Sequence, residues 1–90
     1  MEVTNVKVRL MENTGKLKAV CKVVLDDELA IHDLKIIDGV NGLFIAMPSR
    51  QFKEEYFDIV HPVTNTMREK MERAIFKAYE EAKLEPRVQE

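Results

Sequence analysis

"LAIHDLKIIDGVNGLFIAMPSR", residues 29–50, is the stretch that decides the fold. Two apolar runs are separated by Asp-Gly-Val-Asn-Gly, whose glycines suit the positive φ angles of a tight turn. Residues 43–47 are apolar throughout, which is typical of a strand covered on both faces. Pro48 ends that strand because its nitrogen cannot donate a hydrogen bond to a sheet. The stretch therefore predicts two antiparallel strands followed by a surface segment.

The first of these strands, residues 29–37, contains a change of phase. Leu29 and Ile31 are apolar at odd positions, whereas the next apolar pair stands at even positions. Side chains in a strand alternate between the two faces, so one extra residue moves all later side chains to the other face. We therefore predict a β-bulge at His32 and Asp33.

Upstream, residues 3–10 and 17–25 alternate between apolar and polar side chains, and an Asn and a Gly lie between them. This pattern predicts a hairpin of two half-buried strands. Asp26-Asp27-Glu28 then forms the turn to the third strand. Four cations fall on the open face of the hairpin: Lys7, Arg9, Lys18 and Lys22.

Downstream, residues 49–54 are expected to form a polar loop and residues 56–60 a fifth, short strand. Thr66 and Glu69 have the spacing of a capping box, which predicts a helix that continues to about Lys83. The fold class predicted is α+β: a five-stranded twisted antiparallel sheet followed by one long C-terminal helix packed on it. The expected core-facing residues of the helix are Met67, Met71, Ala74, Ile75, Ala78 and Ala82.

Composition indicates one small cytoplasmic domain of 90 residues, with residues 84–90 as a frayed tail. No apolar run approaches the roughly 20 residues that cross a membrane, and the N-terminus does not resemble a signal peptide. Cys21 is the single cysteine, so the chain has no internal disulfide. The net charge of −2 argues against indiscriminate nucleic-acid binding, which usually accompanies a basic domain.

An enzyme is the least favoured class. Ser49, His61 and Asp58 contain the residue types of a hydrolytic triad, but Ser49 lies in no Gly-x-Ser-x-Gly elbow. His32 and His61 lack the paired spacing of metal ligands, so both are interpreted as structural residues. We predict no catalytic site, no metal, no cofactor and no small-molecule substrate.

The predicted helix offers two surface features. Lys70, Arg73 and Lys77 fall on one flank and could follow phosphates, although a solvated helix face is the alternative interpretation. Phe76 and Tyr79 are expected to face away from the core. They could stack on bases, but we favour a contact with a second copy of the chain.

Four motifs, in order along the chain, resemble the SpoVG family, the stage V sporulation protein G septation regulators of bacteria. They are "MEVTNVKVRL" at 1–10, "HDLKIIDG" at 32–39, "GLFIAMPS" at 42–49 and "DIVHP" at 58–62. The resemblance covers about residues 1–80. It implies a cytoplasmic homodimer, paired through its sheet, that binds DNA and RNA and regulates gene expression.

Carried over by position, the resemblance implies nucleic-acid contacts near the "MPS" loop and along the helix. Gln51 and Phe57 stand where family members often have basic residues, and Glu54 and Glu55 lower the positive charge further. The predicted regulator therefore binds weakly or sequence-selectively, and a protein-interaction adaptor without nucleic-acid binding is the alternative. The nucleic-acid-binding residues implied are Arg50, Arg68, Lys70, Arg73 and Lys77.

Overall fold

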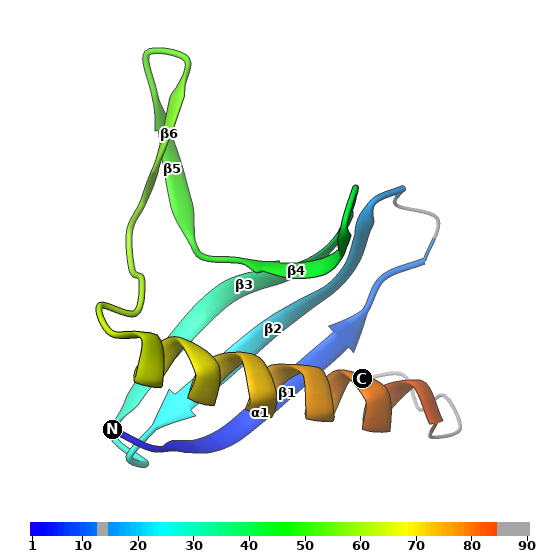
Figure 1. The fold of residues 1–90 in the computed structure, drawn as a ribbon, viewed down its shortest axis with the longest axis vertical. Helices are drawn as coiled ribbons and strands as arrows, with labels where there is room; N and C mark the ends of the chain where they lie inside the picture. Colours follow the sequence, from blue (N-terminus) through cyan, green and yellow to red (C-terminus); the bar gives the residue numbers. More distant parts are fainter. Residues whose placement is uncertain (13–14, 85–90) are drawn as a thin grey trace.

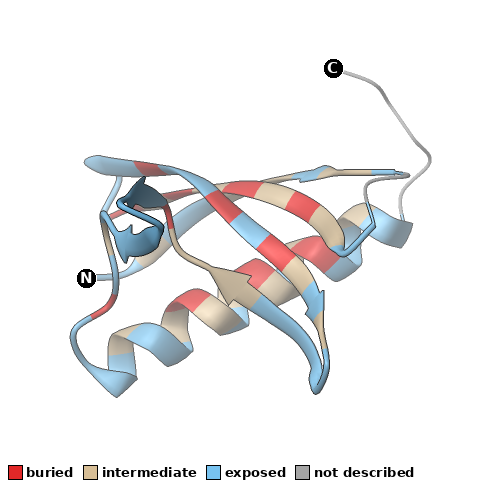
Figure 2. Cartoon of the chain, turned by 90° about the horizontal axis from the view of Figure 1, so that it is seen from above, coloured by how far each residue is buried: buried red, intermediate tan, exposed pale blue. Residues whose placement is uncertain are grey.

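The computed structural model describes residues 1–12 and 15–84, which fold into a sheet with one helix across one of its faces (Figures 1 and 2). The sheet is antiparallel, with its four strands in the order β1-β2-β3-β4, and the α+β class is confirmed. The elements are β1 (Val3–Leu10), β2 (Leu17–Leu25), β3 (Leu29–Gly39), β4 (Gly42–Ala46) and α1 (Asn65–Leu84).

The predicted bulge in β3 is confirmed. Cys21 of β2 lies opposite Leu34, and two residues further along β2 the partner lies three residues back in β3. His32 and Asp33 therefore oppose the single residue Lys22, and Asp33 has a left-handed φ of 68°. The bulge turns the apolar side chains on both sides of it toward the same face of the sheet.

The prediction of a fifth strand in this sheet is wrong. Residues 56–60 do not join it. Instead, β6 (Glu55–Asp58) pairs with β5 (Ser49–Phe52), which includes most of the expected polar loop. The two strands form a separate hairpin that projects away from the sheet (Figure 1). All of their residues are exposed.

Two local features explain this hairpin. Pro48 interrupts the strand direction after β4, because it cannot continue a ladder. Lys53 and Glu54 both have positive φ, at 52° and 69°, which is the backbone of a type I′ hairpin turn. That turn normally uses Asn-Gly, so the Lys-Glu pair gave no signal in the sequence.

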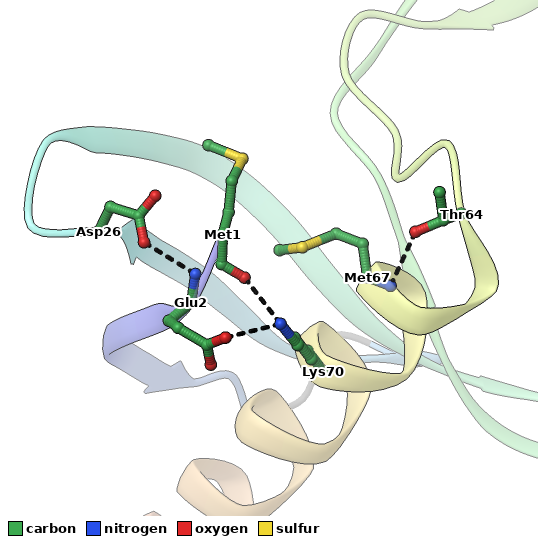
Figure 3. Close-up of polar contacts among 6 residues, drawn as sticks. All are labelled: Met1, Glu2, Asp26, Thr64, Met67 and Lys70. Carbon is green, nitrogen blue, oxygen red and sulfur yellow. Dashed lines mark hydrogen bonds and ion pairs between the residues drawn. The ribbon is translucent and has the colours of Figure 1, made fainter.

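The helix begins with a cap that differs from the predicted one. The Met67 N–H donates a hydrogen bond of 3.1 Å to Thr64 Oγ1 (Figure 3). Thr64 is therefore the cap, and Thr66 lies inside the helix, so the capping box predicted from Thr66 and Glu69 is wrong. The helix ends at Leu84, one residue beyond the prediction, and the tail 85–90 lies outside the described residues.

The helix buries its larger side chains. Ile75 is fully buried and Tyr79 is 6% exposed, whereas Ala74 and Ala78 are only partly buried. The prediction that Phe76 and Tyr79 face outward is wrong, since Phe76 also packs against the core. The helix turns its bulky residues toward the sheet, and this orientation removes more apolar area from water than one that buries its alanines. The buried core consists of Ala19, Cys21, Val23, Leu25, Ile31, Leu34, Ile36, Met71, Ile75 and Tyr79.

Candidate nucleic-acid interface

The structure separates the five residues expected to bind nucleic acid. Arg50 lies on β5, in the hairpin that projects from the body (Figure 1). Arg68 and Lys70 both belong to α1, but they lie about 200° apart around its axis. The set therefore does not form one surface, and only Lys70, Arg73 and Lys77 share a flank of the helix.

Lys70 is engaged within the chain. Its Nζ lies 2.6 Å from Glu2 Oε2 and donates a second hydrogen bond of 3.2 Å to the Met1 carbonyl (Figure 3). The hydrogen bond and the charge of Lys70 lower the pKa of the Glu2 carboxyl. The Glu2 N–H in turn donates to the Asp26 carboxylate, at 2.8 Å. Lys70 thus fixes the start of β1 against the helix.

Arg73 and Lys77 are exposed and form no ion pair within the described ranges. They lie beside two adjoining hollows of 270 and 260 Å³ between β1 and α1, which share Val3, Ala74 and Lys77 in their walls. Because β1 is an edge strand, alternate backbone groups along it have no neighbouring strand to pair with.

The β5–β6 hairpin combines cations with exposed aromatic rings. Arg50 lies opposite Phe57, and Phe52 follows on the same face of the ribbon. The Lys53 ammonium lies 5.3 Å from the centre of the Phe52 ring, a cation–π distance. Three carboxylates in the hairpin, against its two cations, leave it slightly acidic: Glu54, Glu55 and Asp58.

The largest group of cations lies on the side of the four-stranded sheet that α1 leaves uncovered, which we call the open face (Figure 2). The predicted hairpin cations are placed there by alternation with buried neighbours such as Cys21 and Val23. Sequence reasoning missed a fifth cation, Lys35, although it stands between the buried Leu34 and Ile36 once the bulge is placed. The open-face cations are Lys7, Arg9, Lys18, Lys22 and Lys35.

The charge of this sheet is one-sided. Its four strands contain those five cations and two carboxylates, Asp33 and Asp38, in a chain whose net charge is −2. Asp38 follows Ile37 directly in β3, so its side chain points to the opposite face of the sheet. The ion pairs of the described residues join Lys70 to Glu2 and Lys83 to Glu80, so no carboxylate forms an ion pair with an open-face cation there.

An apolar strip crosses the open face between these cations. Ile37 lies opposite Phe44, and the Phe44 ring extends over Gly39, where an added Cβ would come within 2.8 Å of it. The ring is 49% exposed. A glycine beneath an aromatic ring is a common way to secure an edge strand. The members of the strip are Val20, Ile37 and Phe44.

The residues considered for a triad are placed as follows. Ser49 lies opposite Asp58 across the hairpin, and His61 comes three residues after Asp58 in the chain. All three residues are exposed. Within residues 1–12 and 15–84, no hydrogen bond joins His61 to either of them. The described helix is not long and apolar enough to cross a membrane.

Comparison with known proteins gives the family. A family model described as SpoVG matches residues 1–81. A protein from Thermoanaerobacter sp. (strain X514), named "Putative septation protein SpoVG", is 52% identical over 92% of this chain and 91% of its own. Proteins of the same name from Clostridium kluyveri and Lachnoclostridium phytofermentans are 47% and 46% identical over all of this chain, covering 95% and 98% of theirs. The chain therefore belongs to the SpoVG family.

Proposed function

We propose that this protein is a non-enzymatic, cytoplasmic regulator that binds DNA or RNA and modulates gene expression in processes such as septation and sporulation. The relatives' names support a role connected with septation. The observation that carries the nucleic-acid part is the open face, with five cations that form no ion pair within the described residues. Arg73 and Lys77 of α1 and Arg50 of the hairpin add smaller cationic surfaces.

The physical reason is counterion release. Each Lys or Arg that meets a phosphate frees a condensed counterion, so the logarithm of the affinity falls linearly with the logarithm of salt concentration. A cluster of unpaired cations gains the free energy of counterion release at little cost, whereas a cation already paired with a carboxylate must first break that pair. The open face meets this condition, and Lys70 does not.

The test is binding of fluorescein-labelled single-stranded and duplex DNA and RNA as salt rises from low to physiological. We expect binding that weakens steeply with salt. In the triple variant Lys7→Gln/Lys22→Gln/Lys35→Gln, the slope of log affinity against log salt for a single strand should fall by about 2, near 0.7 per cation. Absence of binding by the wild-type chain even at low salt would contradict the proposal.

A protein-interaction adaptor is the second candidate, and the groove between β1 and α1 favours it. An extended peptide could add to the open edge of β1. Arg73 and Lys77 beside the groove would favour an acidic segment. This function predicts indifference to nucleic acid at low salt together with a stable protein complex. Arg73→Glu/Lys77→Glu should dissolve that complex.

We also propose that the chain pairs with a second copy. Tyr79 is buried within its own chain, so a contact through the Phe76 and Tyr79 ring faces is withdrawn. An open strand edge is the remaining route, and β4 offers one with exposed Leu43. Sedimentation of the pure protein over a range of concentrations measures this association directly.

A further inference from the structure

The arrangement of side chains on the open face distinguishes single strands from duplexes. In the central row, Arg9 of β1 lies opposite Val20 of β2, which lies opposite Lys35 of β3. In a neighbouring row, Lys7 lies directly opposite Lys22. Cations thus lie on both sides of an apolar centre in the central row, and Lys22 occupies the middle strand in the neighbouring row.

A duplex fits such a surface poorly. Its phosphates are outermost and its bases are stacked inside, so the apolar strip would desolvate phosphates without giving them a partner. Unpaired nucleotides can instead lay base faces on apolar or aromatic side chains while their phosphates reach the flanking cations. Phe44 is the exposed aromatic ring on this face.

We infer that the open face is a binding site for single-stranded nucleic acid, with bases against the apolar strip and phosphates on the flanking cations. This inference rests on the proposed function and adds to it the strandedness of the ligand and the residues that contact bases. Neither the helix cations nor Arg50 takes part in the base contacts.

The dimensions agree with a short site. From β1 to β4 the sheet spans about 14 Å, three inter-strand spacings, and from Lys18 to Val24 about 20 Å along β2. A surface of this size holds on the order of four nucleotides, the lower end of the range for small β domains that bind single strands. A second copy of the chain is a poor occupant, because its own five cations would face these five.

The test uses the full chain and fluorescence anisotropy with two probes, a labelled oligothymidylate and a labelled DNA duplex of mixed sequence. Phe44→Ala removes a ring without changing charge. Phe57→Ala is the matched control, because Phe57 is also 49% exposed but lies on the separate hairpin. Phe44→Tyr keeps the ring and serves as the rescue variant, and circular dichroism confirms that each variant is folded.

We expect the wild-type chain to bind the oligothymidylate more tightly than the duplex. Phe44→Ala should lower single-strand affinity at least fivefold, the effect of losing one stacked base, with an unchanged salt slope and unchanged duplex affinity. Phe44→Tyr should restore it, and Phe57→Ala should change it less than twofold.

The outcomes separate the two claims. Equal affinity for duplex and single strand, or full single-strand affinity in Phe44→Ala, overturns the inference and leaves the proposed function intact. Equal binding of labelled polyglutamate and oligothymidylate also overturns it, because the surface would then accept any acidic polymer. Binding of neither nucleic-acid probe at low salt overturns the proposed function itself.

Discussion

Lys70 and Glu2 join the helix to the first residues of the chain through an ion pair with an Nζ–Oε2 distance of 2.6 Å (Figure 3). The two residues are 68 positions apart, and Glu2 immediately precedes β1. The pair therefore holds one edge of the sheet under the N-terminal half of the helix. It also pairs with a carboxylate a cation that the sequence had assigned to nucleic acid.

The pH dependence of this pair is the first prediction. Because the pKa of Glu2 is lowered from its ordinary value of 4.5, folded Glu2 holds its proton less tightly than unfolded Glu2. The contribution of the pair to stability is therefore present above pH 4.5 and is lost as pH falls through the lowered pKa. Lys70→Gln should raise the Glu2 titration midpoint, measured from its carboxyl ¹³C chemical shift.

The matched control for that titration is Lys83→Gln. It removes the other ion pair of the described residues, Lys83 with Glu80 at 3.7 Å, and should leave the Glu2 midpoint unchanged. An identical Glu2 midpoint in the wild-type chain and in Lys70→Gln would show that the pair does not form in solution.

The helix cap gives a second prediction. Thr64→Ala should lower the free energy of unfolding by about 1 kcal/mol, because the Met67 N–H loses its acceptor. Thr66→Ala, at an exposed position inside the helix, should change it by less than about 0.5 kcal/mol. Urea unfolding of both variants measures the difference. The reverse order would restore Thr66 as the cap.

The first half of the fold could be predicted from the sequence because its signals are local. Alternation gave the β1–β2 hairpin, and the change of phase gave the bulge at His32 and Asp33. The fifth strand was misassigned because strand partners depend on where the chain turns. That turn is made by Lys53 and Glu54, neither of which carries a hairpin signal.

That turn is the subject of a third prediction. Glu54 has a φ of 69°, a conformation that costs an L-residue about 1 kcal/mol and glycine little. Glu54→Gly should therefore increase the protection of the β5 and β6 amides from hydrogen exchange. Glu55→Gly, the neighbouring control within β6, should decrease it. Lower protection in Glu54→Gly would mean that the turn adopts another conformation.

Cys21 supports a fourth prediction. Burial raises the pKa of its thiol from the ordinary 9.0 to about 11. Between these values the unfolded thiol ionises and the folded one does not, so stability is lost as pH rises above 9.0. Relative to Cys21→Ala, the wild-type chain should lose at most about 1.4 kcal/mol per pH unit there. Urea midpoints of both proteins at pH 8 and 10 test this, and a constant difference would contradict it.

The candidate site was less predictable than the fold. Helical periodicity grouped Lys70, Arg73 and Lys77 correctly on one flank, but it could not show that Lys70 has a carboxylate partner 68 residues away. Lys35 was overlooked for two reasons. The face to which its side chain points depends on the bulge, and the residues beside it depend on the order of the strands. The open face is a product of tertiary structure, in which cations from three strands gather.

The most direct measurement is a map of backbone amide chemical shifts on titration with an unlabelled oligothymidylate. The open-face account predicts that the largest changes occur at Lys7, Lys22, Lys35 and Phe44, with small changes along α1. Changes confined to α1 or to the β5–β6 hairpin would contradict the account and return the binding site to the helix cations or to Arg50.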